Sequence, residues 1–148
     1  MKAVIQRVKK ASVSYGKTLN SIGEGLVVLL GIGKGDSESD IEWLSGKILN
    51  LRIFPDNSGK FNYSVLDIKG DLLVVSQFTL YSDCKKGRRP DFASAEFPDR
   101  ADILYNKFLN VIGKSGLKIE SGRFAADMLV EIHNDGPVTI IMDSRELL

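Results

Sequence analysis

The sequence lacks much of the side-chain chemistry on which many enzymes depend. Its 148 residues include one cysteine, Cys84, and one histidine, His133. A single cysteine cannot form an internal disulfide, and one cysteine with one histidine cannot build a Cys/His zinc cluster. The P-loop pattern GxxxxGK[ST] and the nucleophile-elbow pattern GxSxG are also missing. His133 ends an apolar stretch and Cys84 has no evident base partner, so triad-based catalysis has weak support.

Charge of one sign and long apolar runs are also scarce. The 20 Lys and Arg residues nearly balance the 19 Asp and Glu residues, for a net charge of +1, which argues against a strongly basic nucleic-acid coat protein. The longest apolar stretch, residues 26–30, is too short to span a bilayer. Residues 1–10 alternate charged and apolar side chains, unlike a signal peptide. We therefore expect a cytoplasmic protein with no membrane partner.

The remaining composition is typical of a globular protein, with 43% hydrophobic and 26% charged residues. A chain of this length buries roughly 70% of its unfolded surface, which is enough for a core of its own. No internal repeat, low-complexity tract or proline-rich linker divides it. We predict one domain that covers residues 1–148.

Hydrophobic periodicity predicts several strands and two amphipathic helices. We expect the strand over 71–75 to form a hairpin with the one before it, and the last two strands to be joined by a turn at 134–137. This order favours an α/β domain with mixed or antiparallel sheets and both helices on one side. The expected helices cover residues 38–50 and 100–114, and the expected strands cover residues 2–15 (with a bulge or bend at 9–10), 26–32, 65–68, 71–75, 117–121, 128–134 and 138–143.

A polar segment, Ser76-Gln77-Phe78-Thr79-Leu80, follows the apolar strand that we expect over residues 71–75. Polar groups at the end of a buried strand are where ligands often meet a sheet. In the alternative interpretation, these hydroxyl and amide groups only satisfy the backbone as the strand becomes a loop. The spacing alone leaves both interpretations open.

A long polar loop over 82–98 contains a cluster of four cations, Lys85, Lys86, Arg88 and Arg89, around a glycine. Such a cluster suits the phosphate backbone of a nucleic acid, because glycine allows a close approach. A solvated charged loop is the alternative. Since the whole chain is nearly neutral, the cluster is a candidate site of phosphate contact.

Residues 134–139, Asn-Asp-Gly-Pro-Val-Thr, form a third candidate. Glycine before proline removes the Cβ clash that restrains a pre-proline residue, so Gly136-Pro137 is compatible with a cis bond. Only about 5–6% of X–Pro bonds in folded proteins are cis. A trans turn between two strands is therefore the alternative.

Together these segments resemble the D-aminoacyl-tRNA deacylase family. The resemblance runs essentially from end to end, and two long signatures occur in order, Ser-Gln-Phe-Thr-Leu at 76–80 and Asn-x-Gly-Pro-Val-Thr at 134–139. The opening residues 1–8 match as well. The stretch 122–128 resembles a third motif, in which glycine is common where this chain has Ala125.

The resemblance implies a cytosolic homodimer with a three-layer β-β-α fold. It implies an enzyme that hydrolyses the ester between a D-amino acid and the terminal adenosine of tRNA, with no metal and no cofactor. The expected partner is the acceptor end of tRNA, not DNA. It further implies a cis Gly136-Pro137 bond that reaches into the active site of the other subunit. The implied site residues are Ser76, Gln77, Phe78 and Thr79 for catalysis, Gly136 and Pro137 for a chiral gate, Phe124, Ala125, Asn134 and Thr139 for the substrate pocket, and Lys85, Lys86, Arg88 and Arg89 for tRNA binding.

An aminoacyl ester is already activated, so a weak set of protein groups is enough for its hydrolysis. We expect a positioned water to attack the carbonyl while backbone N–H groups near Phe78 and Thr79 stabilise the oxyanion. In the rival mechanism Thr79 is a nucleophile that forms an acyl-enzyme. Stiff backbone at Gly136 and Pro137 would exclude an L side chain. Because glycine has no side chain to reject, we predict that glycyl-tRNA is hydrolysed as well.

Two other functions stay open at this point. A non-catalytic RNA-binding dimeric module would use the basic loop and leave residues 76–80 structural. A general hydrolase of small esters would use Thr79 and act on simple nitrophenyl esters.

Overall fold

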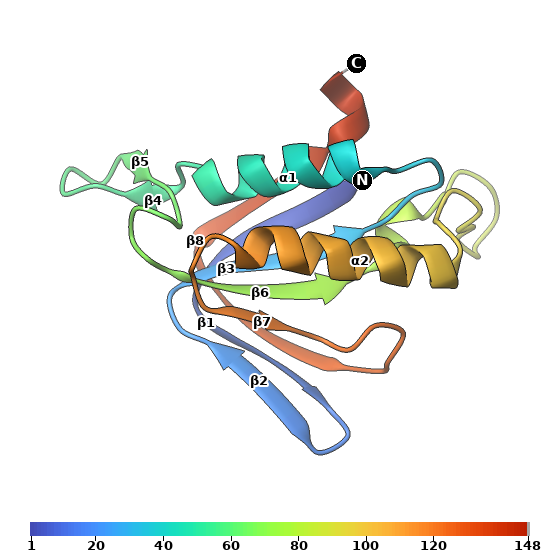
Figure 1. The fold of residues 1–148 in the computed structure, drawn as a ribbon, viewed down its shortest axis with the longest axis horizontal. Coiled ribbons are helices and arrows are strands. Elements are labelled where there is room, and N and C mark those ends of the chain that lie inside the picture. Colours follow the sequence, from blue (N-terminus) through green and yellow to red (C-terminus); the bar gives the residue numbers. More distant parts are fainter. Residues whose placement is uncertain (148) are drawn as a thin grey trace.

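The computed structural model describes residues 1–147, which form one mixed β-sheet and two main helices (Figure 1). The predicted α/β class is confirmed. The sheet has the strand order β2-β1-β3-β6-β7, with β8 paired to the other edge of β1. The strands of this sheet are β1 (Lys2–Tyr15), β2 (Thr18–Ile22), β3 (Gly25–Gly31), β6 (Asp71–Ser76), β7 (Ile119–Ser121) and β8 (Leu129–Asp143). A small separate hairpin consists of β4 (Phe54–Pro55) and β5 (Phe61–Tyr63).

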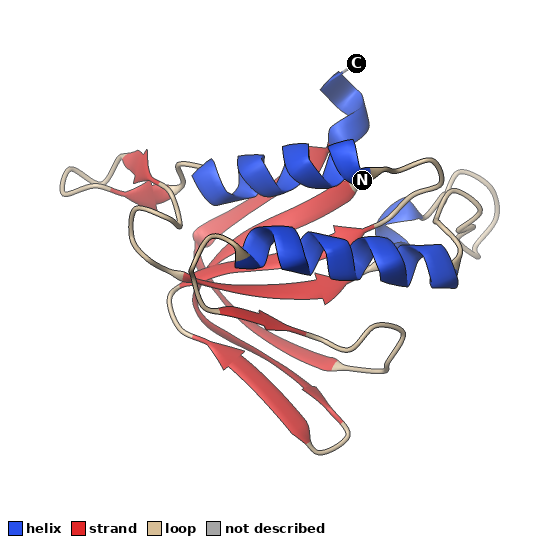
Figure 2. Ribbon diagram, viewed as in Figure 1, coloured by secondary structure: helices blue, strands red, loops and turns tan. Residues whose placement is uncertain are grey.

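Both helices, α1 (Glu38–Asn50) and α2 (Pro98–Gly113), cover one face of the sheet (Figure 2). A capping interaction starts α1, because the Ser37 N–H donates to the Asp40 carboxylate over 2.8 Å. Pro98 occupies the first turn of α2, where its missing N–H costs nothing. The helices bury an apolar stripe against the sheet, and each buried Leu, Ile or Phe side chain contributes about 2 kcal/mol. The order and positions of the two helices agree with the sequence prediction to within two residues.

Two strands, β3 and β6, are buried on both faces. They run parallel, and Leu30 pairs with Ser76 at their ends. Val28 and Val74 face the helices. Val27 and Leu73 face a second core, which is formed with the second half of β1 and the first half of β8. Burial on both faces explains the continuous apolar runs in these strands.

The second core exists because the sheet curls back on itself. β1 bends near Lys9 and Lys10, as the sequence predicted, so its first half pairs with β3 and its second half with β2. The Asn20 side chain then donates a hydrogen bond of 2.7 Å to the Ser121 carbonyl at β7, which brings the two ends of the sheet together. The sheet is therefore nearly closed and barrel-like.

The expected strand over residues 65–68 is wrong. Ser64 and Asp67 instead bond to each other through Ser64 N–H and Oγ, at 2.8 and 2.7 Å from the Asp67 carboxylate. This capping-type pair favours a helical turn, and the Gly70 N–H closes it on the Val65 carbonyl. Strand β6 therefore pairs in parallel with β3 rather than in a hairpin.

The expected turn at 134–137 does not join two paired strands. Both halves of β8 pair with β1, Asn134 with Val8 and Thr139 with Gln6. Residues 135–138 therefore oppose Arg7 alone and form a wide bulge. Strand β2, which lacks clear alternation in the sequence, was not expected at all.

Candidate active site

The end of β6 presents the first group of expected site residues. Ser76 is the last strand residue, and the Gln77 N–H still donates to the Leu30 carbonyl of β3 over 2.8 Å. The chain then turns into the short 3-10 helix η1 (Phe78–Tyr81). The first N–H groups of a helix have no partner inside it, and those of Phe78 and Thr79 have no acceptor anywhere in residues 1–147. Two unused backbone donors therefore lie side by side at the start of η1.

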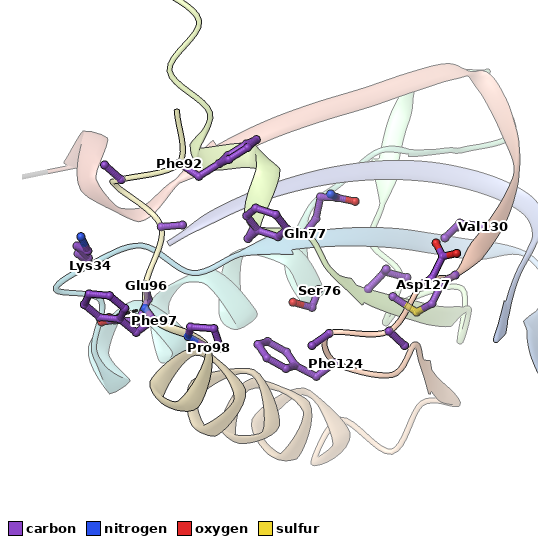
Figure 3. A pocket seen from close by; sticks show the side chains of 17 residues that line it. Lys34, Ser76, Gln77, Phe92, Glu96, Phe97, Pro98, Phe124, Asp127 and Val130 are labelled. Carbon is purple, nitrogen blue, oxygen red and sulfur yellow. Dashed lines mark hydrogen bonds between the residues drawn. The ribbon is translucent and has the colours of Figure 1, made fainter. Parts of the chain in front are cut away.

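Phe78 lines a cavity of about 710 Å³ (Figure 3), whereas Thr79, the next residue, is exposed and lies outside the cavity lining. One side is formed by Ser76, Gln77 and Phe78, and the opposite sides by residues 92–98 and 124–130. The structure thus brings the polar segment of β6 together with the expected pocket residues Phe124 and Ala125, which are distant in sequence. Its full lining is Lys34, Val75, Ser76, Gln77, Phe78, Phe92, Ala93, Ala95, Glu96, Phe97, Pro98, Phe124, Ala125, Ala126, Asp127, Met128 and Val130.

Aromatic contacts make the walls of this cavity firm. The Phe78 ring meets Phe92 edge-on, with 5.0 Å between ring centroids. Phe124 packs on Tyr105 of α2 at 5.9 Å, and the Tyr105 hydroxyl donates to the Val74 carbonyl over 2.9 Å. Burial raises the pKa of Tyr105 well above its usual range, so this residue stays a neutral donor. Phe124 therefore packs on a side chain that is itself hydrogen-bonded to the central strand β6.

The polar side chains near η1 are arranged around Thr79. The Gln77 amide donates a hydrogen bond of 2.5 Å to the Thr79 hydroxyl oxygen. No carboxylate, histidine or lysine of the described chain bonds to that hydroxyl. The acids of the cavity lining are Glu96, which pairs with Arg100 at 3.4 Å, and Asp127 across the cavity (Figure 3). Thr79 is thus an oriented hydroxyl without an adjacent base.

The second group of expected residues lies on the β8 bulge. Asn134 closes this bulge, because its side chain accepts from the Val138 N–H at 2.8 Å and donates to the Val138 carbonyl and the Thr139 hydroxyl. The Gly136-Pro137 peptide bond is cis, and both residues are exposed. Within residues 1–147 neither of them lines the cavity beside η1. Within one chain, the residues of the second signature therefore lie apart from the cavity that Ser76, Gln77 and Phe78 line.

Arg7 supports the bulge, and the sequence analysis did not single it out. Its side chain is buried under residues 135–138, where Nε bonds to the Asp135 carbonyl at 3.1 Å and pairs with the Asp135 carboxylate at 3.2 Å. Its Nη1 donates to the Ile53 carbonyl over 2.6 Å. A charged residue in the inward register of a strand, between Ile5 and Val8, was the available signal.

The basic loop is tied to the cavity through its base. Asp83 and Asp91 exchange two backbone hydrogen bonds, of 2.7 and 2.9 Å, which close the loop just before Phe92 reaches Phe78. Its cations are all exposed, and none of them forms an ion pair with the described part of the chain. These cations are Lys85, Lys86, Arg88 and Arg89. They are free to meet an anionic partner beside the cavity.

The described residues contain no group of three His, Cys, Asp or Glu side chains that could hold a metal ion. Cys84 and His133 are both exposed and lie outside the cavity lining. No helix in residues 1–147 is long and apolar enough to cross a membrane. The cavity offers the unused N–H of Phe78 and apolar walls, and the N–H and the oriented hydroxyl of Thr79 follow directly in the chain, a combination suited to an activated carbonyl substrate.

Comparisons with known proteins find relatives along nearly the whole chain. The family model described as D-Tyr-tRNA(Tyr) deacylase matches residues 4–143. A D-aminoacyl-tRNA deacylase of Aquifex aeolicus is 65% identical, over 99% of this chain and 100% of the relative. Another from Clostridium botulinum is 55% identical over 99% of each chain.

Two solved structures share the fold. One, described as c-Myc DNA Unwinding Element Binding Protein, has a TM-score of 0.90 and 47% identity, and the match covers 97% of this chain and 98% of that one. The other, a probable eukaryotic D-amino acid tRNA deacylase, has a TM-score of 0.82 at 16% identity, covering 95% and 97% of the two chains. The second match bears on the fold alone.

Proposed function

The chain belongs to the D-Tyr-tRNA(Tyr) deacylase family, and from this premise we infer that its cavity beside η1 hydrolyses D-aminoacyl-tRNA. It is an enzyme, an ester hydrolase that releases a D-amino acid from tRNA. The observation that carries the assignment to this cavity is the pair of unused N–H groups at Phe78, which lines it, and at the adjacent Thr79.

We propose that the ester carbonyl lies against these two N–H groups. A carbonyl oxygen becomes an oxyanion when water attacks, and one well-placed donor is typically worth about 3 kcal/mol of transition-state stabilisation. The apolar walls formed by Phe78, Phe92 and Phe124 would receive the terminal adenosine and the amino-acid side chain. The size of the cavity, about 710 Å³, is in the range of ligand pockets.

The geometry around Thr79 favours water as the nucleophile. Its hydroxyl oxygen accepts a hydrogen bond from Gln77, which draws electron density away from that oxygen. A threonine nucleophile needs a base to take its proton, and none contacts it in residues 1–147. The same hydroxyl is free to donate its own hydrogen to the oxyanion. Thr79 is therefore proposed as an orienting donor.

Chiral selection is proposed to need a second copy of the chain. Gly136 and Pro137 are exposed and braced from below by Arg7, and they lie away from the cavity of their own chain. In a homodimer, the layered β-β-α subunits would place this bulge at the mouth of the other subunit's cavity. Its rigid backbone would then leave no room for an L side chain, whereas D-amino acids and glycine would fit.

The tRNA acceptor end is proposed to approach over Lys85, Lys86, Arg88 and Arg89. If three of these cations meet phosphates, the logarithm of tRNA affinity should change with the logarithm of salt with a slope of about −2, at about −0.7 per contact. We place this reaction in the cytoplasm, where the substrate is made.

A paired assay tests the proposal. Purified protein is incubated separately with D-tyrosyl-tRNA and L-tyrosyl-tRNA, and the loss of each ester is followed. Rapid loss of only the D ester is expected. Loss of both would keep the hydrolase but refute the Gly136-Pro137 gate, and loss of neither would refute deacylation.

A nucleic-acid-binding module without turnover is the second candidate. Two observations favour it. The solved structure at 47% identity is described as a c-Myc DNA Unwinding Element Binding Protein, and the cations of the basic loop form no ion pair within residues 1–147. Binding of uncharged tRNA or single-stranded DNA by a protein that cleaves neither ester would select it.

A further inference from the structure

A second cavity, of about 480 Å³, lies next to the candidate active site and is not used by the reaction described above. The two cavities share their dividing wall. Within η1, Phe78 lines the first cavity and Tyr81 the second. On the facing segment, Ala93 and Ala95 line the first, whereas Ser94 between them lines the second. Neighbouring residues of these two segments therefore face different cavities, and the two cavities lie next to each other across them.

The second cavity is polar, and cations gather around its aromatic floor. Lys2 Nζ lies 5.1 Å from the centre of the Tyr81 ring, and the Arg145 guanidinium lies 5.6 Å from it. Lys85, the first cation of the basic loop, lines the same cavity. Three positive side chains from the start, the middle and the end of the chain therefore converge on one hollow.

Two acids, Asp83 and Asp143, also line this cavity against its three cations, and each carboxylate is held by a backbone N–H, which lowers its repulsion of an anion without removing its charge. The Asp83 carboxylate accepts from the Lys85 backbone N–H at 2.8 Å. The Asp143 carboxylate accepts from the Arg145 backbone N–H at 3.1 Å, and it is 3.8 Å from Lys2 Nζ. Arg145 is committed to Asp36 at 2.8 Å. Lys85 makes no ion pair within residues 1–147, and Lys2 makes only the 3.8 Å pair with Asp143 and donates no hydrogen bond from Nζ there, so both ammonium groups keep donors for an anion.

We propose that this cavity binds a backbone phosphate of the substrate's single-stranded end, directly upstream of the nucleoside held in the first cavity. The proposal rests on the proposed function, because it assigns the neighbouring segment of the same substrate. Lys2 is the key residue, with Lys85 beside it. The basic loop would then guide the strand, and the second cavity would fix its register.

The test compares two substrates in wild type and Lys2→Gln: D-tyrosyl-tRNA, and the D-tyrosyl ester of adenosine, which carries no phosphate. Lys17→Gln, in the exposed turn between β1 and β2 at the far end of the molecule (Figure 1), is the matched control. With tRNA, kcat/KM of the wild type should decrease when salt is raised from about 50 to about 200 mM, and in Lys2→Gln this decrease should be smaller by a factor of about 2.6. The factor is the fourfold change in salt raised to the power of about 0.7, the contribution of one lost phosphate contact. The change should appear in KM rather than in kcat, and Lys2→Arg should restore the wild-type salt dependence.

For the adenosine ester, kcat/KM should be the same in wild type, Lys2→Gln and Lys17→Gln. An equal loss on both substrates would overturn the proposal, because it would mean that Lys2 only supports Tyr81 and η1. An unchanged salt dependence on tRNA would overturn it too. If the wild type cleaves neither ester, the proposed function fails. The salt slope of uncharged-tRNA binding in Lys2→Gln then still decides the phosphate site, since a slope equal to wild type refutes it.

Discussion

Replacement of Gly136 by alanine tests how tightly the β8 bulge is built. Gly136 has a φ of +132°, a conformation that L residues rarely adopt. An added Cβ would lie 2.7 Å from Val138 Cγ2, 3.0 Å from the Val138 nitrogen and 3.1 Å from Arg7 Nη2. The backbone conformation costs an alanine about 1–3 kcal/mol, and crowding of this kind adds about 1–3 kcal/mol. Gly136→Ala should therefore lower the free energy of unfolding by about 2–6 kcal/mol.

Gly59→Ala separates these two contributions. Gly59 also has a positive φ, +80°, but nothing lies within 4 Å of its added Cβ. Gly59→Ala should therefore lower the free energy of unfolding only by the cost of the backbone conformation, about 1–2 kcal/mol. Thermal unfolding at fixed protein concentration measures both, at about 3 °C per kcal/mol for a chain of this size. A Gly136→Ala midpoint no lower than that of Gly59→Ala would refute the steric reasoning. The proposed gate further requires that Gly136→Ala change the ratio of D-ester to L-ester hydrolysis while Gly59→Ala leaves it unchanged.

Three further predictions concern the site and its support. Thr79→Ala should lower kcat about tenfold if water is the nucleophile, and trapping of an acyl-enzyme in single-turnover experiments would contradict this. Tyr105→Phe should cost about 1 kcal/mol of stability, the usual net worth of one hydrogen bond, because the Val74 carbonyl keeps a second donor from Gly122 at 3.1 Å. Burial alone would raise the pKa of Asp40, but hydrogen bonds led by that from the Ser144 hydroxyl hold it below its ordinary value of 3.8. A lowered pKa stabilises the fold at pH values above 3.8, and this stabilisation is lost as the pH falls below 3.8 and through the lower pKa of the folded state, so the melting temperature of wild type should fall more than that of Asp40→Asn as the pH is lowered from about 5 to about 2.

The helices and the central strands could be predicted from the sequence because their signals are local. Residues 38–50 have an apolar stripe, and Ser37 and Asp40 form a capping pair at its start; α1 covers this same range. The apolar runs of β3 and β6 are typical of strands that are buried on both faces, as these two are in the structure. Their parallel pairing was not accessible, because a short turn at Ser64–Asp67 looked like a strand until its mutual hydrogen bonds were seen.

The parts of the site that depend on distant partners were harder to predict. The polar segment at 76–79 was found from its place after a buried strand, and Phe124 from family resemblance, but their meeting depends on Tyr105 of α2. The bulge at 135–138 looked like a hairpin turn, since glycine and proline favour both. Its actual form is set by Arg7 on a strand more than a hundred residues away. No pattern within a short window contains that information.

Burial of β3 and β6 on both faces restricts where evolution can alter this protein. Every side chain from Leu72 to Val75 already fills one of the two cores, so almost any change there costs stability before it can affect chemistry. If the cavity binds the substrate as proposed, new substrate preferences should arise in the segments that line it outside the central strands, residues 92–98 and 122–128. Related enzymes that differ in the ester they prefer should differ most in these two segments and least in the strands that carry them.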